Sequence, residues 1–124
     1  MELTGEVTSP NYPGNYTNNL EKTETLQVEE GLILSLQFTA FDIESHSTCG
    51  YDHLTITDGD GTTLMEKSCG SSLPADIIST SNIVKLVFST NFVNTRPGWS
   101  VSWSAVTPGE CQQCNFSSLF QKNH

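Results

Sequence analysis

The chain has 124 residues, enough for one domain with a core and a short tail, and 35% of them are hydrophobic, which argues against a disordered protein. Fourteen acidic residues against five basic ones give a formal charge of −9, so the surface would repel nucleic-acid phosphates and anionic lipid. No apolar run approaches the roughly 20 residues that a membrane-spanning helix needs. Cations and basic protein surfaces are therefore the expected partners.

In chain order, the first two segments are a loop and a strand. The segment Ser9–Asn19 is rich in Pro, Gly and Asn, which is typical of an ordered loop or turn and not of a helix. The segment Leu32–Phe38 (LILSLQF) alternates Leu and Phe side chains with Ile, Ser and Gln. This period of two predicts a half-buried strand.

A hairpin is predicted next. The short strand Leu54–Thr57 runs into the turn sequence DGDG, and Asp-Gly pairs tolerate the positive φ that hairpin turns require. The segment Thr62–Cys69 then forms the returning strand. Asp58 and Asp60 are interpreted as turn residues only, and Asp42 as an acceptor for backbone donors of its own loop.

Two further strands complete the domain, at Ile83–Thr90 and at Trp99–Val106, where large apolar residues alternate with serine. Because no helical apolar stripe persists and short strands follow closely, we expect an all-β antiparallel β-sandwich or barrel. The expected organisation is an N-terminal extension at 1–4, a domain at 5–106 and a linker or tail at 107–124.

The cysteines and glycosylation signals indicate an oxidising compartment. The chain has an even number of cysteines, four, and Asn-X-Ser/Thr sequons at Asn15 and Asn115. Together they favour a secreted, extracellular glycoprotein.

Five segments, in this order and spacing, resemble the CUB domain, an extracellular β-sandwich module. They read GEVTSPNYPGNY, FTAFDIESHSTCGYDHLTITDG, KSCG, SNIVKLVFSTN and GWSVSW, and they span Gly5 to Val106. The resemblance implies a jelly-roll-like sandwich with one central disulfide between Cys49 and Cys69, and the hairpin would bring these two cysteines together. The first disulfide of many CUB domains is absent, since no cysteine precedes Cys49.

The resemblance also implies a calcium site. Many CUB domains bind Ca²⁺ through three acidic side chains, of which Glu44 and Asp52 match residue by residue here. The third position falls in FSTNF, where Asn91 replaces the aspartate. Amide oxygens are ordinary calcium ligands, so Asn91 can still coordinate, and the lost charge predicts weaker affinity.

The partner expected from the resemblance is a protein presenting Lys or Arg. In calcium-binding CUB domains the tyrosine that matches Tyr16 lies beside the ion and, with Glu44, can accept a basic side chain. Calcium would hold the carboxylate rigid for that pair. A glycan on Asn15 could obstruct this surface, whereas Tyr12 is interpreted as packing against the sandwich edge. A homodimer is a further possibility.

Two other interpretations remain open. The chain could be a calcium-independent spacer or exosite of a larger secreted protease. It could also be a carbohydrate-binding sandwich, although Trp99 and Trp103 share one face and are expected in the core.

The sequence lacks G-x-S-x-G and phosphate-loop motifs, so no enzyme activity is expected. An EF-hand is excluded by Thr63 and Cys69 at two obligatory positions. The remaining candidate metal ligands are interpreted as surface histidines and tail cysteines: His46, His53, His124, Cys111 and Cys114.

Overall fold

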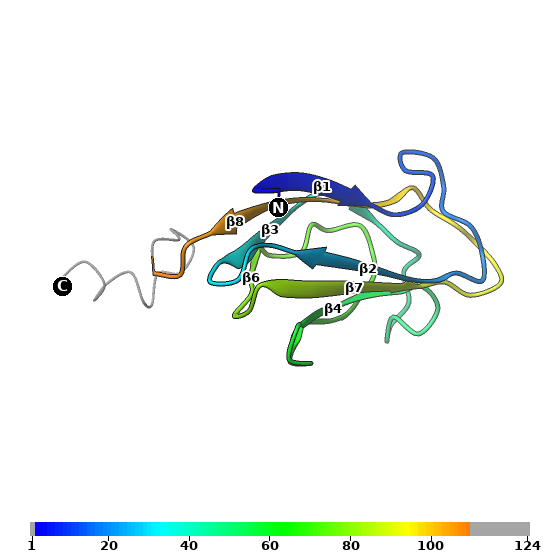
Figure 1. Ribbon diagram of the computed structural model, residues 1–124. Helices are drawn as coiled ribbons and strands as arrows, with labels where there is room; N and C mark the ends of the chain where they lie inside the picture. The colour runs from blue at the N-terminus through cyan, green and yellow to red at the C-terminus, as the bar shows by residue number, and fades with distance from the viewer. Residues whose placement is uncertain (1, 110–124) are drawn as a thin grey trace.

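The computed structural model describes residues 2–109, and all its regular elements are β-strands (Figure 1). No helix in that range is long and apolar enough to cross a membrane. The strands are β1 (Thr4–Thr8), β2 (Glu21–Gln27), β3 (Ile33–Asp42), β4 (His53–Asp58), β5 (Thr63–Ser68), β6 (Ile77–Ile78), β7 (Ile83–Ser89) and β8 (Gly98–Val106).

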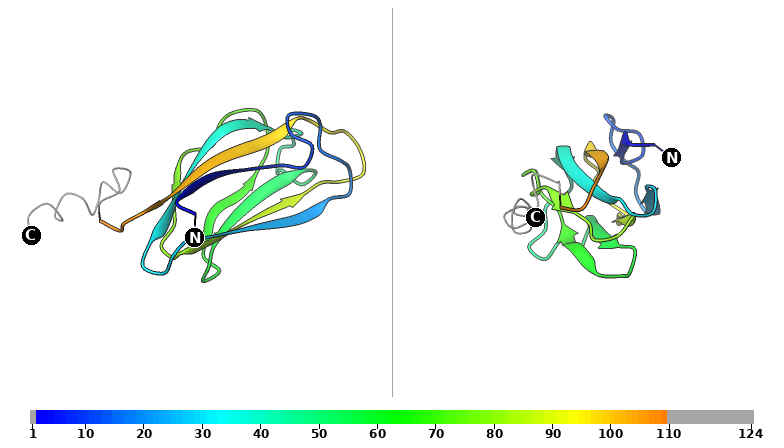
Figure 2. Two further views of the ribbon diagram at one scale, coloured as in Figure 1. Left: turned by 45° about the horizontal axis from the view of Figure 1, so that its top comes forward. Right: turned by 60° about the vertical axis from the view of Figure 1, so that its left-hand side comes forward.

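The strands form two four-stranded antiparallel sheets packed face to face (Figures 1 and 2). One sheet has the order β1-β8-β3-β6, and the other has the order β2-β7-β4-β5. The predicted all-β antiparallel sandwich is therefore confirmed. Strands adjacent in sequence frequently lie in different sheets, so the connecting loops cross the ends of the sandwich.

The core lies between the sheets and follows the period of two in the central strands. In β7 the side chains of Val84, Leu86 and Phe88 are fully buried, while Lys85 between them is exposed. Fully burying one such side chain contributes about 1.5–3 kcal/mol to stability. The opposite sheet contributes Trp99, whose ring lies edge-on to Phe88 at 5.9 Å between centroids.

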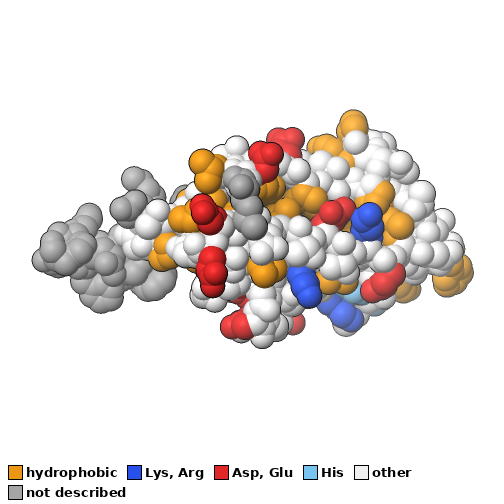
Figure 3. All heavy atoms as spheres, in the orientation of Figure 1, with side chains coloured by type: hydrophobic (Ala, Val, Ile, Leu, Met, Phe, Trp, Pro, Cys, Tyr) orange, Lys and Arg blue, Asp and Glu red, His pale blue; other side chains and the backbone are white. Residues whose placement is uncertain are grey.

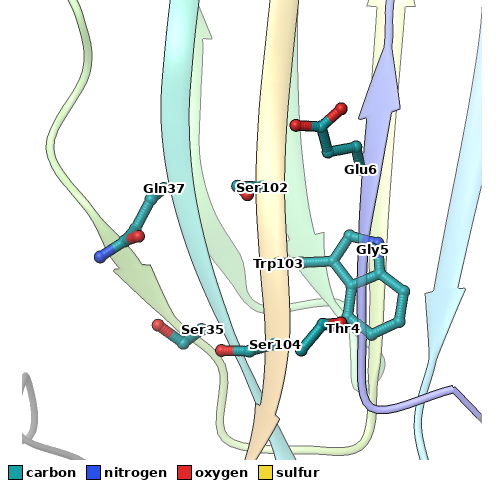
Figure 4. Close-up of a pocket in the computed structure, with 8 residues that line it drawn as sticks. All are labelled: Thr4, Gly5, Glu6, Ser35, Gln37, Ser102, Trp103 and Ser104. Atoms are coloured by element: carbon teal, nitrogen blue, oxygen red, sulfur yellow. The ribbon is translucent and has the colours of Figure 1, made fainter.

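Trp99 and Trp103 both belong to the core face of β8, as the sequence predicts. Trp99 is 1% exposed, and Trp103 packs against the buried cluster. Trp103 also lies flat against Gly5 of β1, where an added Cβ would come within 2.7 Å of the ring (Figure 4). Trp99 is therefore closed to a sugar, whereas the partly buried Trp103 lines a surface pocket with residues such as Glu6 and Gln37.

Strand β3 extends four residues beyond the predicted end at Phe38 and continues to Asp42. The pairing with β8 shifts between Phe38 and Ala40, and the Thr39 hydroxyl donates to the Ser100 carbonyl at 3.3 Å. A bulge inserts one residue and breaks the alternation that sequence reasoning relies on.

The predicted hairpin is formed by β4 and β5, and the disulfide between Cys49 and Cys69 is confirmed, with 5.5 Å between the Cα atoms. Asp58, however, does more than make the turn. It is 2% exposed and accepts from Gly59, Ser81 and both donors of Thr80. It thus ties the hairpin to the loop before β7.

The two ends of the domain lie together, away from the longest loops. Strand β1 pairs with β8 from Thr4 opposite Ser104 to Thr8 opposite Ser100, and the Ala105 amide donates to the Leu3 carbonyl at 2.7 Å. The loops that follow β1 and precede β8 turn at the opposite, right-hand end of Figure 1.

Candidate cation and partner site

Three loops meet at that end of the sandwich, namely residues 9–20, 43–52 and 90–97, and we call this the loop end. The first and third loops are joined by backbone bonds, because the Tyr16 amide donates to the Arg96 carbonyl at 3.1 Å and the Asn19 amide to the Asn91 carbonyl at 2.7 Å. Gly98 adopts a φ of 95° against Ser9, where any Cβ would clash.

Tyr16 is the residue on which the site is built. Its side chain is 1% exposed and its ring packs edge-on against Phe88 at 4.9 Å. The hydroxyl donates to Oδ2 of Asp52 at 2.6 Å and accepts from the Glu44 amide at 3.1 Å. Burial, followed by the bond to Asp52, raises the pKa of the phenol, so Tyr16 stays protonated and keeps donating.

Asp52 is a wholly buried carboxylate held in a fixed orientation. It is 0% exposed, and its second oxygen, Oδ1, accepts from the Asn91 amide at 2.8 Å. Each carboxylate oxygen has two acceptor positions, so one donor on each leaves capacity for a cation. Residue 52 directly precedes β4.

Glu44 carries an unpaired buried oxygen. Its Oε2 accepts from Nδ2 of Asn94 at 2.9 Å, whereas its Oε1 is buried and has no hydrogen-bond partner. Buried polar atoms are almost always partnered, because an unpaired one costs the desolvation free energy of the group. A cation bound to Oε1 would remove that cost.

Asn91 is the predicted third ligand, at the position where the resemblance implies an aspartate in calcium-binding CUB domains. Its side-chain oxygen accepts from the Val93 amide at 3.2 Å. Within residues 2–109 no three His, Cys, Asp or Glu side chains converge. The donor set of Glu44, Asp52 and Asn91 still fits calcium, which accepts carboxylate, amide and carbonyl oxygens alike.

Asp42 does not bond its own loop, which corrects the sequence interpretation. Its carboxylate instead pairs with the Arg96 guanidinium, with 3.0 Å between Nε and Oδ1. The hydrogen bond and the charge of Asp42 raise the pKa of Arg96. Both residues line a pocket beside Glu44, so Asp42 is neutralised while Glu44 is not.

The histidines take no part in a metal cluster within residues 2–109. Nδ1 of His46 accepts from the amides of Thr48 and Gly50, and its ring lies 4.0 Å from that of Tyr51. His53 is partly buried, and burial lowers its pKa. The predicted Cys111, Cys114, Asn115 and His124 lie outside the described residues.

Sequence reasoning brought Tyr16, Glu44, Asp52 and Asn91 together, and the structure places them in one hydrogen-bonded group. It missed Asn94 and Arg96. Asn94 adopts a φ of 61°, and asparagine is among the few residues that take this conformation readily. An asparagine at position 94 could have suggested a turn, but the local sequence does not indicate that this residue pairs with Glu44, which is 50 residues away.

Comparison with known proteins finds one domain family and several larger proteins that resemble this chain. The CUB domain family model matches residues 1–103. Tolloid-like protein 1 of mouse is 37% identical over 101 residues, which are 80% of this chain and 10% of that protein. Cubilin of pig is 34% identical over 85% of this chain and 3% of its own length. The chain thus spans a small part of such relatives.

Among solved structures, the MASP-1 CUB2 domain bound to Ca²⁺ superimposes with a TM-score of 0.76 and 33% identity. The match covers 83% of this chain and 93% of that domain. Its sandwich therefore corresponds to this one over nearly its whole length.

Proposed function

This chain belongs to the CUB domain family, and we propose that its loop end binds one calcium ion and, with it, a basic side chain of a partner protein. CUB domains are generally non-catalytic modules, found in extracellular proteins. The observation that carries the proposal is the buried, unpaired Oε1 of Glu44, a residue whose backbone amide donates to the same Tyr16 hydroxyl that bonds the Asp52 carboxylate.

The proposed calcium ligands are Glu44, Asp52 and the side-chain oxygen of Asn91. The ion supplies positive charge that neutralises two carboxylates in a partly buried site. The surrounding residues do the positioning. Tyr16 and the Asn91 amide hold the two oxygens of Asp52, and Asn94 holds one oxygen of Glu44. The MASP-1 CUB2 domain, which binds Ca²⁺, supports this assignment by likeness.

A basic side chain would pair with the exposed part of Glu44. The chain has a formal charge of −9, so it attracts cationic groups as they approach. Tyr16 is too deeply buried to meet a partner first, so its contribution is to fix the Glu44 backbone through the hydroxyl. A prearranged carboxylate binds an ammonium group with a smaller loss of side-chain entropy.

An extracellular location is part of the proposal. The Cys49–Cys69 disulfide persists in oxidising compartments, and the sequon residue Asn15 is exposed and could receive a glycan there. The fold relatives that support this location include cubilin and Tolloid-like protein 1.

A calcium-independent spacer or exosite is the second candidate. It is favoured by the fact that both Asp52 oxygens and the Asn91 amide oxygen already have donors within the chain. In that case the loop end would be stable without an ion. The two candidates make opposite predictions for a calcium titration.

Thermal unfolding of the chain separates them. An ion that binds only the folded state raises stability by RT ln(1 + [L]/Kd), so we expect the midpoint to rise with millimolar calcium, but not with magnesium, relative to EDTA. Glu44→Gln should abolish the rise, whereas the exposed control Glu66→Gln should retain it. An identical midpoint in EDTA and calcium would instead support the spacer.

Binding of the basic side chain is tested separately. With calcium present, the chain should bind an immobilised lysine-bearing peptide and should not bind the same peptide after lysine acetylation, which removes the charge. Equal binding to both peptides would contradict the proposal even if calcium stabilises the fold.

A further inference from the structure

The loop from Asn91 to Asn94 is attached at both ends to the proposed cation ligands. At its start, the Asn91 amide donates to Oδ1 of Asp52 at 2.8 Å. At its end, Nδ2 of Asn94 donates to Oε2 of Glu44 at 2.9 Å. The two residues between these anchors are therefore held directly beside the site.

Those two residues are apolar and point to solvent. Phe92 is 74% exposed, the largest exposure among the large hydrophobic residues of the described chain, and Val93 is 40% exposed. Apolar side chains also reach the surface at the right-hand end of Figure 3, where this loop turns. A single exposed apolar residue is ordinary on a protein surface, whereas an adjacent exposed pair beside the proposed cation site is a candidate contact surface.

The turn itself is fixed rather than open. The Val93 amide donates to the side-chain oxygen of Asn91 at 3.2 Å, and Asn94 closes the turn with a left-handed φ of 61°. The backbone bond from Asn19 to the Asn91 carbonyl holds the turn from the other side. Phe92 and Val93 are thus presented in a defined conformation, which reduces the entropy lost on binding.

We propose that Phe92 and Val93 form an apolar contact surface next to the cation site, and that the partner is a protein segment in which a Lys or Arg lies within a few residues of an apolar side chain. This inference rests on the proposed function. The basic residue would pair with Glu44 while its apolar neighbour packs on Phe92. The net charge of −9 favours such a segment over an anionic lipid surface, which would also accept an apolar tip.

The anchoring also predicts that the two contacts are coupled. The turn is hydrogen-bonded to the carboxylates of Asp52 and Glu44. Calcium that fixes the positions of these carboxylates therefore also fixes the positions of Phe92 and Val93. The apolar contribution to binding should therefore weaken when calcium is removed.

The test uses the full chain, calcium, and three synthetic peptides of equal length. One carries lysine flanked by leucines, one carries lysine flanked by serines, and one carries acetyl-lysine flanked by leucines. We expect the leucine-flanked lysine peptide to bind about tenfold more tightly than the serine-flanked one, which corresponds to partial burial of one large apolar side chain. The acetylated peptide should not bind.

The double variant Phe92→Ser/Val93→Ser should lose that tenfold preference and keep its binding to the serine-flanked lysine peptide. Both side chains are exposed, so folding is unaffected, and unfolding midpoints verify this. The matched control is Leu3→Ser, because Leu3 is 62% exposed but lies beside Ala105 at the far end of the sandwich. It should keep the preference.

Equal affinity of the wild-type chain for both lysine peptides would overturn the apolar surface while leaving the proposed function intact. Absence of any lysine-dependent binding would overturn both. Calcium-dependent binding to phosphatidylcholine–phosphatidylserine vesicles that the double variant loses would overturn the protein partner, since it would assign Phe92 and Val93 to a membrane.

Discussion

The Tyr16 hydroxyl donates to the Asp52 carboxylate at 2.6 Å, and this bond joins the loop after β1 to the start of β4 inside the protein. The two residues are 36 positions apart and both are fully buried. The ring of Tyr16 meanwhile packs on Phe88. The candidate cation site is therefore continuous with the hydrophobic core, and its geometry depends on packing as much as on charge.

Tyr16→Phe should destabilise the domain and weaken calcium binding together. The change leaves the ring in place but removes the donor to Asp52 and the acceptor for the Glu44 amide. Loss of a buried bond to a charged group costs about 1.5–3 kcal/mol, measurable by urea unfolding in EDTA. Calcium titration then reports affinity. Unchanged stability would mean that Asp52 does not depend on this donor.

Asn91→Asp should strengthen calcium binding. The substitution restores a third carboxylate, and the number of charged ligands is one determinant of calcium affinity, so we expect roughly a tenfold lower Kd. Without calcium the variant should be less stable than the wild type, because the new charge lies beside Asp52. Isothermal titration and unfolding in EDTA measure the two effects. An unchanged Kd would exclude the Asn91 side chain as a ligand.

Asp58→Asn should destabilise the domain in a pH-dependent way. Burial opposes the charged form of Asp58, but donors from Ser81, Thr80 and Gly59 outweigh it and lower the pKa of the carboxyl. A lowered pKa in the folded state contributes stability that is complete above the unfolded value of about 3.9 and is lost as the pH falls through the folded value.

The cost of Asp58→Asn should therefore be about 2–4 kcal/mol near pH 7 and should shrink as the pH falls below about 4. Denaturant unfolding of both proteins from pH 2 to pH 7, at ~1 unit intervals, tests this. Asp60→Asn is the control, because Asp60 is an exposed residue of the same turn. A gap that stays constant across this range would contradict the assigned role.

Replacing both cysteines of the disulfide by serine should cost about 3 kcal/mol, because the sequence separation of 20 corresponds to a short closed loop. The same loop carries Asp52, so calcium affinity should fall as well. Unfolding of the double variant Cys49→Ser/Cys69→Ser with and without calcium separates the two effects. A full-strength calcium response in this variant would show that the site does not need the disulfide.

A glycan on Asn15 should reduce partner binding. Nδ2 of Asn15 donates to Oγ1 of Thr95 at 3.1 Å, and Thr95 lines the pocket that also contains Glu44. Protein from glycosylating cells should bind the lysine peptide less tightly than the same chain treated to remove glycans. Thr17→Ala eliminates the sequon without touching Asn15 and should bind like the deglycosylated chain. Equal binding by all three samples would place the glycan clear of the partner surface.

All four central strands were predicted from the sequence, because burial of one face imposes a strict alternation, whereas the edge strand β5 was predicted from the hairpin turn that precedes it. β7 and β8 show it clearly. Strand β2 (Glu21–Gln27) was missed because it is an edge strand whose side chains are largely exposed, so no apolar period marks it. Exposed Lys and Glu residues are common on such edges, where they discourage pairing with other chains.

The candidate site likewise has a part that could be predicted from the sequence and a part that could not. The motifs FD.E and C.YD predicted Glu44 and Asp52 as calcium ligands, because a resemblance to a family carries over residue positions. The pairs that complete the site could not be read from sequence, since Asn94 reaches Glu44 across 50 positions and Arg96 reaches Asp42 across 54. Such contacts are set by how the loops meet after the sheets have packed.

The pairing of β1 with β8, which brings Leu3 beside Ala105, has a consequence for how the domain could be used in a longer polypeptide. Chain entering at residue 2 and chain leaving at residue 109 depart from one pole of the molecule, while residues 91–94 occupy the other. Neighbouring modules joined at both connections would lie around the end that carries residues 2 and 109. The end that carries residues 91–94 would point away from these modules, where a partner could approach from several directions.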